Sequence, residues 1–130
     1  MQFIITSNLF MLLPIGAALY VHDLGYFYIG LLAIVSSSLF HTVLADFPNR
    51  KNLLQFSRGL DWTVAIFAYG YMFFYVFTKS YHSLRIPLIL GLVATLLFFW
   101  YGFKLSDYKR LHPWFHVITS FVSTIVVLSI

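Results

Sequence analysis

The chain has 130 residues, of which 61% are hydrophobic and only 9% are charged. This balance excludes a water-soluble globular protein, because too few polar side chains are present to cover a solvated surface. Lysine and arginine outnumber acidic residues by 8 to 4, which gives a formal charge of +4, but the basic residues lie between apolar runs. We therefore expect an integral membrane protein that is anchored at the lipid headgroups, with no nucleic-acid partner.

Five apolar stretches are long enough to cross a bilayer, which requires about 20 helical residues. They cover residues 2–20, 24–45, 58–78, 85–104 and 111–129. The first stretch contains Asn8 and Pro14 and has no basic residue ahead of it, so we interpret it as a retained helix and not as a secretory signal peptide. The sequence thus predicts an all-α fold, in which residues 1–130 form one domain, an integral membrane bundle of five transmembrane helices.

Basic residues are unevenly divided between the two ends of the predicted helices. The side that carries the N-terminus also carries two connections, whose basic residues are Arg50, Lys51, Arg58, Lys104, Lys109 and Arg110. The opposite side holds Lys79 and Arg85. By the positive-inside rule, this asymmetry predicts that the N-terminus lies on the cytoplasmic side of the membrane.

The stretches contain four histidine or acidic side chains, and all four lie close to one membrane face. His41 is near the end of the second stretch and Asp61 near the start of the third, while His112 and His116 open the last. Because successive helices run in opposite directions, all four are expected in one layer on the cytoplasmic side. Such residues are costly in hydrocarbon, so they usually face a polar interior and mark a functional site.

The local spacing of these residues favours a metal site. Ser37 precedes His41 by four residues, and His112 precedes His116 by the same interval, which places each pair on one helix face. Three histidines with an open fourth position are typical of catalytic zinc. Because the chain has no cysteine, the ligands must be nitrogen and oxygen atoms. We expect the three histidines to bind zinc.

The other two polar residues are expected to act beside that metal. A carboxylate such as Asp61 can accept a proton from water, and the hydroxyl of Ser37 can orient the water or donate to a developing oxyanion. Each residue also has a structural explanation when it is taken alone. Asp61, close after Gly59, could cap the third helix. Membrane histidines and serines often bond to backbone or pack between helices. Their joint placement favours the metal site.

The pattern Ser-x-x-x-His, a later Asp, and His-x-x-x-His in the last helix resembles the signature of the CREST superfamily of membrane hydrolases. This superfamily includes alkaline ceramidases, the adiponectin and progestin receptor family, phospholipases that act on GPI-anchored proteins, and the fusion protein myomaker. The matching positions are Ser37, His41, Asp61, His112 and His116. The segment from residue 111 to residue 116 is most similar to the myomaker-like branch. Members of the superfamily usually have seven helices, whereas this chain has room for five.

The resemblance implies a zinc ion bound by the three histidines and hydrolysis of an amide or ester bond in a membrane lipid. One alternative is a myomaker-like protein that remodels or fuses membranes and keeps zinc only for its structure. Another is a carrier of haem or metal that uses the paired histidines. The sequence leaves open which lipid and which membrane are involved. It also leaves open whether a second copy of the chain completes the site as a homo-oligomer.

Overall fold

The computed structural model describes residues 6–104 and 108–130, and these ranges are helical, without a strand. The elements in chain order are the 3-10 turn η1 (Asn8–Met11), α2 (Leu12–Tyr20), α3 (Leu24–Asp46), α4 (Lys51–Thr78), the 3-10 turn η2 (His82–Leu84), α5 (Arg85–Lys104) and α6 (Tyr108–Leu128). Within the described ranges, α3, α4, α5 with its preceding turn, and α6 are long and apolar enough to cross a membrane. The predicted all-α membrane bundle is therefore confirmed.

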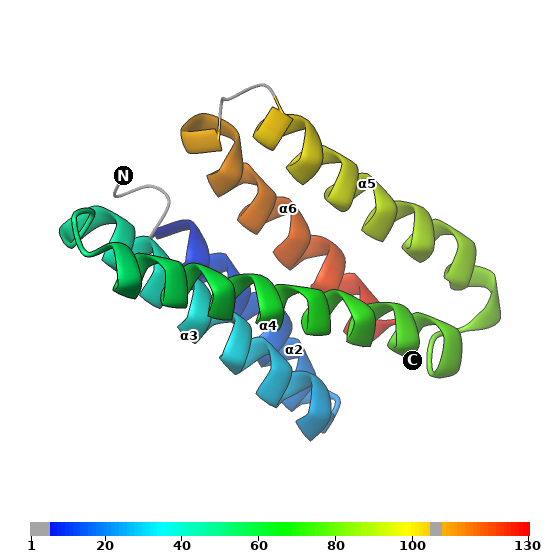
Figure 1. Cartoon of the computed structure of the whole chain (residues 1–130). Coiled ribbons are helices and arrows are strands. Elements are labelled where there is room, and N and C mark those ends of the chain that lie inside the picture. Colours follow the sequence, from blue (N-terminus) through cyan, green and yellow to red (C-terminus); the bar gives the residue numbers. More distant parts are fainter. Residues whose placement is uncertain (1–5, 105–107) are drawn as a thin grey trace.

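The helices form a closed ring. Each helix from α2 to α5 packs against the next one in the chain, and α6 packs against α2 to complete the circle. Figure 1 shows α5 and α6 running side by side, while α4 and α5 diverge from the turn that joins them. The ring brings α3 and α6, the two histidine-bearing helices, to either side of α2.

The structure describes the first helical segment from residue 6 onward. Within it, the apolar helix Asn8–Tyr20 falls below the length of a full membrane span. Residues 2–5 of the predicted first helix lie outside the described residues. The change from 3-10 to α-helical geometry occurs just before Pro14, which lies in the first turn of α2. Proline is tolerated there because the first turn of a helix has unpaired amides in any case.

Helix α4 begins at Lys51, so the predicted start at residue 58 is wrong. Polar residues such as Gln55 and Arg58 lower the hydropathy of this segment without ending a helix, and hydropathy reports immersion in lipid more directly than helical structure. With 28 residues, α4 is longer than a span requires. Asp61 consequently lies well inside α4, and its suggested role as an N-terminal cap is wrong.

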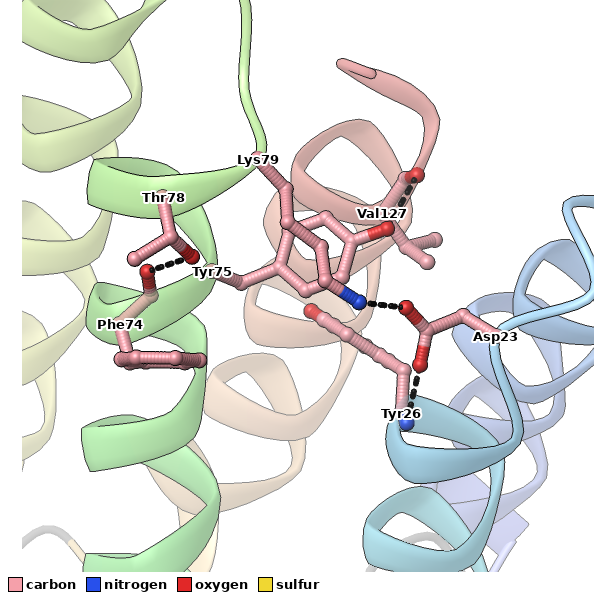
Figure 2. A network of polar contacts seen from close by, with 7 residues as sticks. All are labelled: Asp23, Tyr26, Phe74, Tyr75, Thr78, Lys79 and Val127. Atoms are coloured by element: carbon pink, nitrogen blue, oxygen red, sulfur yellow. Dashed lines mark hydrogen bonds and ion pairs between the residues drawn. The ribbon is translucent and has the colours of Figure 1, made fainter.

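Polar contacts close the end of the bundle that lies opposite the histidines. Asp23 caps α3 by accepting a hydrogen bond from the Tyr26 amide at 2.9 Å, and it pairs with Lys79 just beyond α4 (Figure 2). The Lys79 ammonium lies 4.9 Å from the centre of the Tyr75 ring, and the Tyr75 hydroxyl donates to the carbonyl of Val127 at 3.3 Å. These contacts join the start of α3 to the ends of α4 and α6.

The buried apolar core lies toward this same end. It contains Tyr75, Leu92 and Val126, which come from α4, α5 and α6 and are fully buried. The Tyr26 hydroxyl forms a 2.7 Å hydrogen bond with Ser123 Oγ, and both residues line a cavity that begins at this level. The bundle is thus packed at the Asp23 end and hollow toward the histidines.

Candidate metal centre

Three histidines from α3 and α6 meet at the end of the bundle that lies opposite Asp23. The Nε2 atom of His41 lies 3.1 Å from Nε2 of His112, which in turn lies 2.9 Å from Nε2 of His116. All three side chains are buried, and each offers a nitrogen within 4.8 Å of the other two. The structure therefore brings together the three residues predicted as ligands, and together they could hold a metal ion.

The arrangement of the nitrogens fits a cation better than hydrogen bonds alone. A neutral imidazole nitrogen carries either one proton or one lone pair, so Nε2 of His112 cannot be fully satisfied by both neighbours. The Nδ1 atoms of His112 and His116, on the other side of each ring, are buried without a described hydrogen-bond partner, and binding of an ion at Nε2 would not change this. A tetrahedral ion with bonds of about 2.0–2.1 Å holds its nitrogen ligands about 3.3 Å apart, close to the observed separations.

Aromatic rings surround the histidine cluster and orient it. The Tyr108 ring stacks on the His112 ring, with centroids 4.2 Å apart and planes at 24°. Phe99, from α5, meets His112 edge-on at 5.8 Å, and Phe40 lies 5.0 Å from the neighbouring His41 ring. Tyr108 was not predicted as a site residue. Its position one helical turn before His112 is the signal that could have found it.

Helix α6 presents two of the histidines from its first turns. Pro113, buried between them, lies inside the helix, where its missing N–H leaves a carbonyl of the preceding turn without its usual partner. One turn after His116, the Ser120 hydroxyl donates to the His116 carbonyl at 2.6 Å. The backbone at His116 therefore accepts a side-chain hydrogen bond from Ser120, within the helix that carries both histidines.

Ser37 is buried beside the cluster but its hydroxyl already has a partner. It donates to Oδ1 of Asn8 at 3.3 Å, and Nδ2 of Asn8 donates to Ser38 Oγ at 3.1 Å. These bonds attach the first helical segment to α3, one turn before His41. Sequence reasoning noted Asn8 as a polar residue in an apolar stretch without assigning it to the site. A buried asparagine at membrane depth is itself a sign of such a contact.

Asp61 shares a cavity with two of the histidines. It lies on α4, is half-buried, and lines the same cavity as His112 and His116. It does not belong to the group of closely spaced ligand atoms, and it makes no hydrogen bond or ion pair with another described residue. Its carboxylate is therefore free to act on a molecule that occupies the space between α4 and α6.

The cavity has a volume of about 450 Å³ and is lined by α2, α3, α4, α5 and α6. This volume is within the range of small-molecule sites. Its walls are largely apolar, with Ile29, Ala65 and Leu96 among the lining residues. Polar groups occur at three levels: the histidines with Asp61 at one end, Tyr69 with Thr119 in the middle, and Tyr26 with Ser123 at the other end.

Neither a protein-family model, nor a curated protein, nor a solved structure matches this chain. The site is therefore characterised by its own residues. They establish a helical membrane protein with a buried group of three imidazoles at the end of an apolar cavity.

Proposed function

We infer that this protein is a zinc-dependent intramembrane hydrolase that cleaves an amide or ester bond in a lipid. One observation carries the proposal: three buried Nε2 atoms from α3 and α6 converge at the end of an apolar cavity that is also lined by a carboxylate with no hydrogen bond to a described residue. The resemblance of Ser37, His41, Asp61, His112 and His116 to the CREST pattern supports the same activity.

Zinc is the metal that this donor set favours. His41, His112 and His116 supply three neutral nitrogen ligands, and a site of three protein ligands leaves one position open, as catalytic zinc requires. Oxygen-preferring ions such as magnesium and calcium would need carboxylate or carbonyl ligands in place of imidazoles. When bound, zinc supplies Lewis acidity that polarises a carbonyl oxygen and activates water at neutral pH.

We assign proton transfer to Asp61 and hydrogen-bond donation to the oxyanion to Ser37. Asp61, which forms no hydrogen bond with the part of the chain that the structure describes, takes a proton from the attacking water and returns it to the leaving nitrogen or oxygen. Ser37 donates to the developing oxyanion once its hydroxyl turns away from Asn8, and until then it fixes α3 against the first helical segment. Asn8 is thus a positioning residue for the face of α3 that carries His41.

The cavity suits a lipid whose reacting bond lies near the headgroups. Its apolar walls accommodate an acyl chain. The basic residues Arg50, Lys51 and Lys104 lie at the same end of the bundle as the histidines, and by the positive-inside rule this end is cytoplasmic. We therefore place the reaction just beneath the cytoplasmic surface.

A second function is favoured by one observation. Because the Ser37 hydroxyl is already bonded to Asn8, the centre also suits a myomaker-like protein in which zinc stabilises the bundle and no bond is cleaved. Haem is less suitable, because Nε2 separations of 2.9 and 3.1 Å leave no room for a porphyrin between two of the rings.

Purified protein tests both functions directly. We expect zinc in the wild-type protein by elemental analysis, and release of fatty acid or free amine from mixed lipid vesicles by mass spectrometry. In Asp61→Ala the zinc content should persist while lipid turnover is lost. Zinc without turnover in the wild-type protein, against a panel of amide and ester lipids, would favour the structural role instead.

A further inference from the structure

We propose that Tyr69 and Thr119 form a hydrogen-bond-accepting site within the cavity, which selects lipids that carry a hydroxyl or N–H donor a few bonds from the group held at the histidines. Both side chains line the cavity. Thr119 follows His116 by three residues on α6, which places it about 4.5 Å farther along the helix axis. The inference rests on the proposed function in one respect: a lipid enters with its polar group toward the histidines.

Tyr69 is held at the junction of three helices. Its Oη atom, from α4, lies 2.9 Å from Oγ1 of Thr95 on α5 and 3.1 Å from Oγ1 of Thr119 on α6. The phenol ring stacks on Phe115 with centroids 6.4 Å apart and an angle of 15° between the planes. The hydroxyl is therefore fixed in position before any ligand arrives.

The direction of these hydrogen bonds follows from a further bond, which Thr95 makes to a backbone carbonyl. Thr95 Oγ1 lies 2.7 Å from the carbonyl oxygen of Leu92, and a carbonyl has no proton, so Thr95 must donate. A threonine hydroxyl has one proton, so Tyr69 must donate to Thr95. For the same reason, Thr119 must donate to Tyr69. The protons run in one direction, from Thr119 through Tyr69 and Thr95 to Leu92.

This direction leaves only acceptors facing the cavity. All three hydroxyl protons are used within the chain, whereas Thr119 Oγ1 accepts from no described residue and Tyr69 Oη retains a second acceptor position. A lipid hydroxyl or N–H that is removed from water without a partner is destabilised, and these oxygens supply that partner. A lipid with acceptors alone gains nothing at this level.

A purely structural role in joining helices does not explain why Tyr69 and Thr119 line the cavity. Thr95, which completes the link, is buried and does not line the cavity, as expected for a group that only connects helices. Tyr69 and Thr119 are half-buried and line it. A structural bridge would change the melting temperature alone, whereas an accepting site also changes which ligand is preferred.

The test compares β-hydroxymyristic acid with myristic acid, which differ by one donor-bearing hydroxyl. Affinities for the purified, zinc-loaded chain are measured in detergent micelles by displacement of a fluorescent fatty acid. Because the two acids partition differently into micelles, the quantity compared between variants is the ratio of their two Kd values. We express the ratio as the Kd of myristic acid divided by the Kd of β-hydroxymyristic acid. This ratio should be about three- to tenfold larger in wild-type protein than in the double variant Tyr69→Phe/Thr119→Val.

The conservative variant Thr119→Ser keeps the hydroxyl and should retain the wild-type ratio. Zinc content and thermal melting show whether the double variant folds. If it does not, the ratio is compared between Thr119→Val and Thr119→Ser, in both of which the hydrogen bond from Tyr69 to Thr95 is kept. Equal ratios in wild-type protein and in variants without the hydroxyls would overturn the accepting site while leaving the proposed function intact. Failure of both acids to bind wild-type protein would overturn the lipid cavity itself.

Discussion

His41 and His112 are separated by 71 positions in the chain, yet their Nε2 atoms lie 3.1 Å apart. Few contacts in the bundle join such distant segments through side chains that are so costly to bury. Two imidazoles facing each other in a membrane interior need an ion or a shared proton between them. The addition of His116 to the pair makes the ion the better explanation.

The metal content of the protein should depend on this contact. We expect about one zinc per chain, lost in His116→Ala, because two imidazoles alone do not complete a stable site. His82→Ala is the matched control, since His82 is exposed and lies at the opposite end of the bundle. Inductively coupled plasma mass spectrometry on both variants measures the difference. Unchanged zinc in His116→Ala would remove this residue from the ligand set.

Asp61 should control turnover without controlling metal content. Replacement by asparagine keeps the shape of the side chain but removes the proton acceptor, so hydrolysis of a responsive lipid should fall by about 10²- to 10⁴-fold. Zinc content should stay at the wild-type level, because Asp61 is not among the converging ligand atoms. Asp46→Asn, at the exposed end of α3, is the comparison variant. Loss of zinc from Asp61→Asn would instead make this carboxylate a ligand.

The ion pair at the other end of the bundle should give stability that depends on pH. Partial burial raises the pKa of Asp23, but hydrogen bonds from Lys79 and the Tyr26 amide outweigh burial and hold it below its ordinary value of 3.8. The hydrogen bond to Asp23 raises the pKa of Lys79. A lowered carboxyl pKa stabilises the folded state above the unfolded value, and this contribution is lost as pH falls through the folded pKa.

Asp23→Asn tests this dependence, because asparagine preserves the helix cap and removes the charge. At neutral pH the variant should melt below wild-type protein, by a free-energy difference of at most about 1 kcal/mol for a pair exposed in part. As pH falls below the carboxyl pKa, the two melting temperatures should converge. A gap that persists in acid would show that shape, and not charge, sets the contribution of Asp23.

Packing of α2 on α3 should tolerate little added volume. A Cβ atom on Gly30 would lie 2.7 Å from Cγ1 of Ile15, whereas one on Gly70 would meet no atom within 4 Å. We expect Gly30→Ala to destabilise the protein by about 1–3 kcal/mol. Gly70→Ala should stabilise it by about 0.5–1 kcal/mol through the helix backbone. Thermal melting in one detergent compares them.

Removing the obstructing side chain provides the check on this prediction. In the double variant Ile15→Ala/Gly30→Ala, the loss of stability should be smaller than the sum of the two single losses, because the clash is gone. Additive losses would mean that Gly30 and Ile15 are not in contact in the membrane. The closure of the helix ring by α2 would then need revision.

The sequence predicted those features that depend on local periodicity. Apolar runs of sufficient length gave the bundle, and the four-residue spacing of His112 and His116 placed both imidazoles on one helix face. The start of α4 was missed because polar residues lower the hydropathy of its first turns, although the helix itself begins at Lys51. Helical structure and immersion in the membrane are separate properties, and composition reports the second.

Contacts between distant segments could not be predicted in the same way. Nothing in the spacing of Asn8 and Ser37 indicates that one accepts a hydrogen bond from the other, since their contact depends on how α2 packs between α3 and α6. The chain of hydroxyls through Tyr69, Thr95 and Thr119 likewise needs three helices in register. Such contacts depend on the order of helices around the ring, which hydropathy does not specify.

The place of α6 in that ring has a consequence for biosynthesis. The helix carrying His41 precedes α6 in the chain, and the other two imidazoles arrive only with α6, which also closes the circle against α2. A nascent chain that has not yet inserted α6 has only one of the three histidines of the candidate site. On the proposed zinc site, metal capture would follow the insertion of α6, and a product truncated before α6 would be distinguishable in the cell by its lack of the cation.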